Sequence, residues 1–372
     1  MKSSFHLPPA VAAIPWVMLL PLTALVLFGA AVLHSAAGGS MTAYAWSHLV
    51  RFAVFLAMAL VISRVPRELV LRGALPAYVG VLVMLVGVEL LGQVSGGSQR
   101  WLDLGFVRLQ PSELMKPGIV LVLASFFGKL PPAMLRTWHA LGAPAALIGV
   151  PVGLVMLQPD LGTGLAITFG GIVVLFLAGL PLWWFLSGAA AAAVAAPLAY
   201  FFALHDYQRN RVLTFLDPEN DPLGTGYHIT QSKIAIGSGG VFGKGFGQGT
   251  QSHLDYLPEP HTDFVFATMA EEWGMAGGIF VLLVFGIILA WGRNVSRAAP
   301  DRFSRLLAGG MTATVFFYVA INLMMVMGLA PVVGIPLPFM SHGGTSMMTN
   351  LICLGTLMMV DRWNRKGANL PG

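Results

Sequence analysis

Long apolar segments alternate with more polar connections along almost the entire chain. About 20 consecutive apolar residues are enough to cross the hydrocarbon core of a bilayer as a helix, so each segment predicts one membrane-spanning helix. The first segment is long for a signal peptide and further spans follow it, so we expect it to remain as an uncleaved anchor. The predicted spans are 14–34, 47–63, 74–92, 113–129, 138–157, 162–180, 182–203, 263–291, 306–328 and 341–360.

The pattern predicts an all-α polytopic membrane protein. It has about ten transmembrane helices, with a large structured extracytoplasmic loop (about 204–262) between the seventh and the eighth. Of the 372 residues, 56% are hydrophobic and 10% are charged, and the mean hydropathy is +0.76. A soluble domain carries about 25% charged residues, so we expect a single transmembrane domain over 1–372. The lone cysteine, Cys353, excludes an intramolecular disulfide.

The few charges are segregated, which indicates membrane orientation and not nucleic-acid binding. Three connections, the second, the fourth and the eighth, and the C-terminal segment are basic, and the positive-inside rule places them in the cytoplasm. Both termini are then cytoplasmic, and the loop at 204–262 faces outward. The basic residues concerned are Arg64, Arg67, Arg72, Lys129, Arg136, Arg293, Arg297, Arg302, Arg305, Arg362, Arg365 and Lys366.

The outer loop contains the most unusual pattern in the chain. Nine glycines fall between Gly224 and Gly249, and acidic and histidine residues follow them. Glycine lets a backbone approach a ligand closely and expose its N–H groups. Carboxylates beside such a loop at a membrane surface indicate proton-transfer chemistry on a lipid-attached anionic substrate. The acidic and histidine residues are His253, Asp255, Glu259, His261 and Asp263.

Carboxylates within or beside the spans have two interpretations each. Asp263 opens the eighth span, either as a helix-capping acid or as a general base, and the two roles are compatible. Glu271, Glu272 and Glu89 lie deeper in spans. A charge at that depth faces a partner or a cavity, so each is either half of a structural pair or a functional group.

The third and fifth connections supply further candidates. Glu113 and Lys116 stand three residues apart on one helix face, either as a neutralising ion pair or as a grip on a diphosphate. Arg100, beside Trp101, is either an interfacial anchor or a phosphate contact. Asp160 either caps the sixth span or contributes to a binding site.

Basic residues on the outer side run against the positive-inside bias. An anionic lipid substrate would account for them, as would ordinary headgroup anchoring. The ninth connection holds three prolines and is followed by Gly343 and Gly344, and such non-helical backbone is tolerated at membrane depth where it packs against protein or lines a wet cavity. Ser341 and Thr345 could there donate to a bound headgroup. The outer basic residues are Arg209, Arg211, Lys233 and Lys244.

Seven motifs resemble those of the SEDS family of shape, elongation, division and sporulation proteins, which includes RodA and FtsW. The motifs occur in family order, and the resemblance covers nearly the whole chain. The motifs are QRW (99–101), QPSELMK (110–116), QPDLGTG (158–164), GSGGVFGKGFGQGTQ (237–251), LPEPHTDFVFA (257–267), EEWG (271–274) and GIPLPFMSHGGTSM (334–347).

The resemblance implies a peptidoglycan glycosyltransferase that polymerises lipid II onto an undecaprenyl-diphosphate-linked glycan at the outer face of the bacterial cytoplasmic membrane. It implies a class B penicillin-binding protein as the crosslinking partner, and it favours a RodA-like role in elongation over an FtsW-like role in division. The family's essential aspartate falls on Asp263. The nearby acid falls on Asp255, where many relatives have glutamate. Relatives can depend on a divalent cation, Mg²⁺ or Mn²⁺, but no complete ligand set is visible in this sequence.

Two other classes of function fit parts of the pattern. A lipid II flippase would also have many spans, broken helices and intramembrane acids. It needs a polar pathway that reaches both leaflets, however, and here the unusual residues cluster on the outer side, which favours an enzyme. A non-catalytic scaffold for the crosslinking enzyme is compatible as an added role, although the carboxylate cluster argues against it as the sole one.

Overall fold

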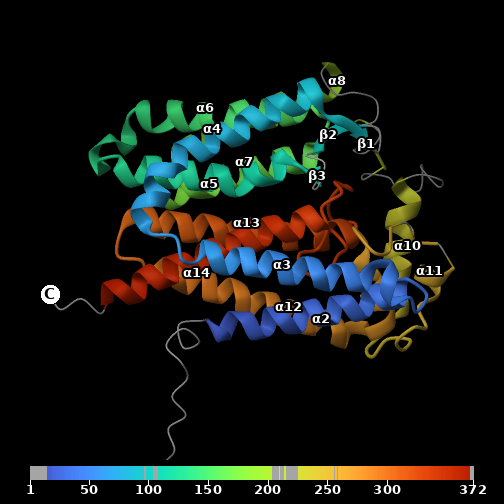
Figure 1. Cartoon of the computed structure of the whole chain (residues 1–372). Helices are drawn as coiled ribbons and strands as arrows, with labels where there is room; N and C mark the ends of the chain where they lie inside the picture. Colours follow the sequence, from blue (N-terminus) through green and yellow to red (C-terminus); the bar gives the residue numbers. More distant parts are fainter. Residues whose placement is uncertain are drawn as a thin grey trace, which may run out of the picture.

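The computed structural model describes residues 15–95, 98–103, 108–202, 209, 213–214, 225–254, 256–257 and 259–368. Helices dominate these residues and run roughly side by side (Figure 1). The helices are α2 (Trp16–Ala36), η1 (Met41–Ala45), α3 (Trp46–Ile62), α4 (Arg67–Leu91), α5 (Pro111–Lys129), η2 (Pro132–Arg136), α6 (His139–Leu157), α7 (Leu161–Leu177), α8 (Leu182–Phe202), α10 (Thr225–Ser238), α11 (Thr250–His253), α12 (Val265–Ala298), α13 (Arg302–Val326) and α14 (Gly344–Ala368).

Each predicted span coincides with one long helix of the described chain. Seven helical segments are long and apolar enough to cross a membrane, which confirms a polytopic membrane protein. The other three are α5, α7 and α14. Of these, α7 has only 17 residues, and α5 carries Glu113 and Lys116 near its start. The count of ten spans therefore stays a prediction.

The long helices form two packed groups (Figure 1). Helices α4, α5, α6 and α7 make one group, and α2, α3, α12, α13 and α14 make the other; α13 joins the two by packing on α5 and α7. Small residues permit the closest contacts: a Cβ at Gly355 of α14 would lie 2.9 Å from the Cα of Ala59 in α3. Such close approach is how helices gain packing energy where lipid provides no hydrophobic drive.

One end of the bundle carries the strands together with α10 and α11, and the chain's C-terminus lies at the other (Figure 1). The strands β1 (Gln93–Ser95), β2 (Ser98–Asp103) and β3 (Arg108–Leu109) form an antiparallel sheet in the order β1-β2-β3. In the register, Val94 pairs with Gln99 and Leu102 with Leu109. The hydrophobic pattern does not predict this sheet, because strands this short carry little periodicity.

At the opposite end, Asp301 caps α13. Its carboxylate accepts hydrogen bonds from the Ser304 backbone N–H at 3.0 Å and the Ser304 hydroxyl at 2.7 Å, and it pairs with Arg67 at 2.9 Å. Burial opposes ionisation, but the bonds from Ser304 and Arg67 outweigh it and hold the pKa of Asp301 below its usual value. The cap therefore links the start of α4 to the start of α13.

We expect Asp301→Ala to lower the free energy of unfolding by about 1–2 kcal/mol at pH 7, because an N-cap and its charge-assisted bonds are lost. The folded-state pKa lies below the unfolded value of about 3.9, so this stabilisation is present above that pH and is lost as pH falls through the folded-state pKa. Thermal unfolding in detergent should show a smaller difference in melting temperature between the variant and wild type at pH 3 than at pH 7. A gap that does not change with pH would refute the ionised cap.

Candidate functional site

A polar cavity of about 390 Å³ opens at the end of the bundle that carries the sheet. Six segments that are far apart in sequence line it: β2, the start of α5, the start of α7, the turn before α12, the loop after α13 and the start of α14. The polar residues that line it are Arg100, Gln110, Glu113, Asp160, Thr163, Thr262, Asp263, His342, Thr345 and Ser346.

Asp263 lies on the cavity wall, half-buried, in the turn that precedes α12. The N-cap of α12 is Phe264, which makes no side-chain cap, so Asp263 stands one residue outside the helix and is not its N-cap. The backbone around Asp263 is fixed by Asn322, whose side-chain amide donates to the carbonyl oxygens of Asp263 at 2.9 Å and Ile335 at 2.8 Å. This anchoring presents the carboxylate at a defined place beside the loop after α13.

The loop after α13 has non-helical backbone, as predicted, and it is tied to the turn that holds Asp263. The Ser341 hydroxyl donates to the Thr262 carbonyl oxygen at 2.6 Å, and the His342 N–H donates to the His261 carbonyl oxygen at 2.8 Å. Ser341 is buried and does not line the cavity, whereas Thr345 does. Ser341 therefore holds the wall together, and of the two predicted hydroxyl donors only Thr345 lines the cavity.

Arg100 and Asp160 meet at the mouth of the cavity. The Arg100 guanidinium donates to the carbonyl oxygens of Gln158 at 3.1 Å and of Pro159, and it lies 4.0 Å from the Asp160 carboxylate. Asp160 accepts from the Thr163 N–H at 3.1 Å, which confirms its predicted capping role on α7. Both side chains also face the cavity.

A buried charged triad lies beneath the cavity, formed by Glu113, Lys116 and Tyr318. The Lys116 ammonium donates to a Glu113 carboxylate oxygen at 2.6 Å and to the Tyr318 hydroxyl oxygen at 2.7 Å, and that hydroxyl donates to the other Glu113 oxygen. Lys116 is 1% exposed and does not line the cavity. The ion-pair interpretation is confirmed, and the ammonium is fully engaged inside the protein.

The glycine-rich loop packs on α12 and not on the cavity. Gly274 has φ +63°, which interrupts α12. The carbonyl oxygens of Glu271 and Glu272, which lose their helical donors there, accept from the N–H groups of Lys244 and Gly245 at 2.9 and 3.1 Å. In return, the Met275 and Ala276 N–H groups donate to loop carbonyl oxygens. These loop N–H groups are therefore used within the protein, not by a phosphate.

Side chains reinforce this docking. Glu271 pairs with Lys244 at 2.6 Å and accepts from the N–H groups of Thr250 and Gln251, so its predicted structural pairing is confirmed. Glu272 accepts from the Ser35 hydroxyl of α2. Glu89 is exposed. Lys244 accordingly stabilises the loop and lies away from the cavity lining.

Three further predicted site residues, Glu259, Arg209 and Lys233, are not among the residues that line the cavity. The Glu259 side chain is 64% exposed and approaches His261 at 3.4 Å. Arg209 donates to the Phe201 carbonyl oxygen at 2.9 Å, and Lys233 packs on Gly328. Asp255 and Arg211 lie outside the described residues, so their predicted roles remain predictions.

The structure adds residues that the sequence analysis did not select. Gln110 lines the cavity and donates to Asp160 at 3.3 Å. His342 also lines it, and its ring contacts Arg51 of α3 at 3.2 Å. Both residues stand inside the quoted motifs, and that was the only signal available for them.

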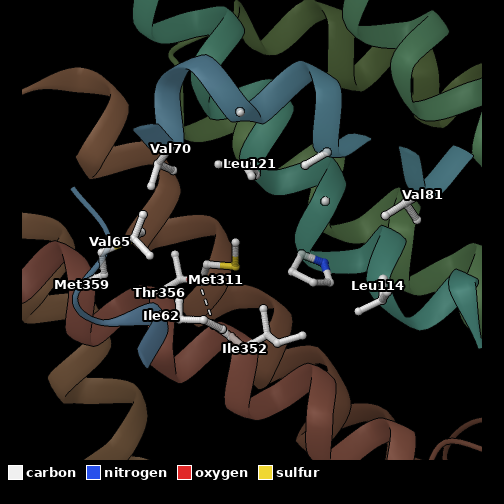
Figure 2. A pocket seen from close by; sticks show the side chains of 14 residues that line it. Ile62, Val65, Val70, Val81, Leu114, Leu121, Met311, Ile352, Thr356 and Met359 are labelled. Atoms are coloured by element: carbon white, nitrogen blue, oxygen red, sulfur yellow. Dashed lines mark hydrogen bonds between the residues drawn. The ribbon is translucent and has the colours of Figure 1, made fainter. Parts of the chain in front are cut away.

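An apolar groove of about 340 Å³ lies between α4, α5, α13 and α14 (Figure 2). Val70 and Val81 approach it from α4, and Ile352 and Met359 from α14, while no charged side chain lines it. Leu114 lines the groove, and the preceding residue, Glu113, lines the cavity. The groove therefore leads along α5 towards the polar cavity. Small residues such as Gly73 and Gly118 leave this space open.

Comparisons with known proteins point in one direction. The sequence model of the FTSW_RODA_SPOVE family (cell cycle protein) matches residues 11–366. The chain is 44% identical, over 92% of each chain, to the peptidoglycan glycosyltransferase MrdB of Escherichia coli K12. It is 38% identical, over 84% of this chain and 85% of the relative, to the probable peptidoglycan glycosyltransferase FtsW of Coxiella burnetii.

Two solved structures have the same fold. The rod shape determining protein RodA of Thermus thermophilus superposes with a TM-score of 0.72 at 31% identity, over 95% of this chain and 98% of that one. A chain from a study of polymerisation and crosslinking by a peptidoglycan synthase complex superposes with a TM-score of 0.82 at 34% identity, over 94% and 98%.

Proposed function

Because the chain belongs to the FTSW_RODA_SPOVE family of cell cycle proteins, we propose that it polymerises lipid II into glycan strands at the outer face of the bacterial cytoplasmic membrane. Its similarity to MrdB over 92% of both chains supports the peptidoglycan glycosyltransferase activity. The higher identity to MrdB, 44%, than to FtsW, 38%, favours elongation and rod shape over division. The observation that carries the mechanism is the position of Asp263 on a polar cavity beside an apolar groove.

Asp263 is the proposed general base. It takes the proton from the GlcNAc 4-hydroxyl of lipid II while that oxygen attacks the anomeric carbon of the donor glycan. The new glycosidic bond forms with inversion, and undecaprenyl diphosphate leaves with the bonding electrons. Asn322 contributes by fixing the Asp263 backbone, since a base must be placed accurately to act.

The diphosphate is proposed to bind between Arg100 and the N-terminus of α14. The start of α14, from Gly344 through Ser346, lines the cavity. A helix N-terminus presents unsatisfied N–H groups and a partial positive charge to an anion. Arg100 adds a full charge at the mouth, and Thr345 adds a hydroxyl donor. These groups would stabilise the charge that develops on the leaving diphosphate.

One isoprenoid chain is proposed to lie in the apolar groove (Figure 2). The groove has no charged lining and leads towards the cavity past Leu114, so a lipid with its headgroup in the cavity could place its tail there. Burial of its methylene groups would retain the substrate without adding to catalysis.

The membrane orientation follows from charge. The end opposite the cavity carries Arg67, Lys129, Arg302 and Arg365, which the positive-inside rule assigns to the cytoplasm. The cavity then faces outward, both termini are cytoplasmic, and all ten long helices span the bilayer. A class B penicillin-binding protein is the proposed partner, because a similar chain occurs in a study of a complex that couples polymerisation to crosslinking.

The divalent-cation requirement remains a prediction. Among the described residues, no group of three His, Cys, Asp or Glu side chains is placed to hold a metal ion. Glu113 is already engaged by Lys116 and Tyr318. The described residues thus do not form a protein metal cage.

Polymerisation of purified lipid II in detergent tests the function. The protein would be assayed alone and with its penicillin-binding partner, whose transpeptidase is blocked. Glycan ladders in either condition support the polymerase. Their absence in both, together with lipid II crossing vesicle membranes that contain the protein, would replace it with the flippase.

We expect Arg100→Lys to raise the KM for lipid II about tenfold at unchanged thermal stability. Lysine is a point charge and cannot hold two carbonyl oxygens while it presents a fork of donors to a diphosphate. Steady-state kinetics would be compared with Arg64→Lys, an exposed residue at the other end of the bundle. A variant that loses stability but keeps its KM would show that Arg100 only supports the 158–160 turn.

A further inference from the structure

A second pocket, of about 470 Å³, lies on the other side of the α4–α5 pair from the groove of Figure 2. Leucine, valine, phenylalanine and proline side chains from α4, α5 and α6 form most of its wall, and Ser125 is its only uncharged polar lining residue. Unlike the groove, the pocket is also lined by two cations, Arg72 of α4 and Lys129 at the end of α5. We call it the basic lipid pocket.

Both cations are exposed and, within the described residues, neither makes an ion pair or a hydrogen bond. Neighbouring cations differ in this respect. Arg67 pairs with Asp301, and Arg302 donates to the carbonyl oxygens of Leu130 and Ala178 at 3.1 and 2.7 Å. The acid closest in sequence, Glu68, lies one turn before Arg72 and does not line the pocket. Two positive charges at the rim of an apolar pocket are thus left without a protein counter-charge.

The pocket wall is held in place by a contact between helices. Pro151 in α6 has no N–H to give to the carbonyl oxygen of Leu147, four residues earlier. The Tyr78 hydroxyl of α4 donates to that oxygen instead, at 2.9 Å. Leu147 lines the basic lipid pocket, so this bond fixes the spacing of α4 and α6 where that pocket opens between them.

We propose that the basic lipid pocket binds one anionic phospholipid of the cytoplasmic leaflet. The phosphate of the lipid lies at Arg72 and Lys129, and part of an acyl chain enters the apolar interior of the pocket. The pocket lies at the end of the bundle that the positive-inside rule places in the cytoplasm. Basic pockets between helices on that side of a membrane meet anionic headgroups. The site lies at the opposite end from the catalytic cavity, so the proposal does not depend on the proposed polymerase mechanism.

Native mass spectrometry of the full-length protein in detergent tests the proposal. The probes are palmitoyl-oleoyl phosphatidylglycerol and phosphatidylcholine with the same chains. We expect wild type to retain one phosphatidylglycerol at least tenfold more tightly than phosphatidylcholine. Arg72→Gln/Lys129→Gln should weaken phosphatidylglycerol binding about 30-fold, since each cation near an anionic headgroup contributes roughly fivefold. On a logarithmic scale, the affinity of each single variant for phosphatidylglycerol should lie about halfway between that of wild type and that of the double variant.

The matched control is Arg293→Gln/Arg297→Gln. It removes two exposed cations of α12 that lie at the same end of the bundle but outside the pocket, and it should bind phosphatidylglycerol as wild type does. Leu75→Trp fills the pocket from a side chain that is 57% exposed, and it should weaken binding without disturbing the core. Thermal unfolding in lipid-free detergent checks that each variant is folded. Equal losses in the two double variants, or full binding by Leu75→Trp, would overturn the proposal.

Discussion

Replacing Asp263 with asparagine is expected to lower the rate of lipid II polymerisation by about 10²–10⁴-fold while the protein remains folded. The amide keeps the size of the carboxylate but cannot accept the proton of the attacking hydroxyl. The Asn322 bonds that fix this segment go to backbone carbonyl oxygens, so they survive the substitution. Glycan ladders from purified variant and wild type measure the loss.

The matched control is Asp361→Asn, which also removes one carboxylate. Asp361 pairs with Arg365 at 2.7 Å near the C-terminal end of α14, far from the cavity lining. Because this pair lies outside the cavity, the variant should polymerise at nearly the wild-type rate. Wild-type-like turnover by a folded Asp263→Asn protein would remove Asp263 from the role of base.

The second large effect is expected in the buried triad beneath the cavity. We expect Lys116→Met to destabilise the protein by about 3–5 kcal/mol, because it leaves the Glu113 carboxylate buried without a counter-charge. Lys116 is 1% exposed and Tyr318 is fully buried, and the Glu113 carboxylate, which also lines the cavity, is 7% exposed, so water replaces the lost bonds only in part. Chemical unfolding in detergent gives the difference in free energy.

Glu113→Gln/Lys116→Met provides the control for this prediction. Removal of both charges together should recover much of the loss, since neither charge is then left alone. The comparison also separates the two interpretations of Lys116. A Lys116→Met protein with wild-type stability and a greatly raised KM for lipid II would mean that the ammonium serves the substrate and not the ion pair.

The hydrophobic pattern and the motifs were enough to predict the long helices and several local features of the site. Each predicted span coincides with a long helix, and the non-helical backbone before α14 was expected from its prolines and glycines. The pairing of Lys116 with Glu113 was one of two interpretations of their spacing on one helix face, and the pairing of Glu271 was one of two for a charge at membrane depth; the structure contains both pairs. These properties are local, so the sequence contains them.

The sequence by itself determined which segments leave water and which side chains bear chemistry, because transfer of apolar residues into a bilayer sums along the chain. The tertiary structure alone decided how those residues are used. It brought Arg100, Asp160 and Asp263 to one cavity, and it placed Lys244 in the docking of the glycine loop on α12. It also opened a groove and a basic pocket on opposite sides of α4 and α5. Cavities arise from the relative placement of helices distant in sequence, and no local pattern encodes that placement.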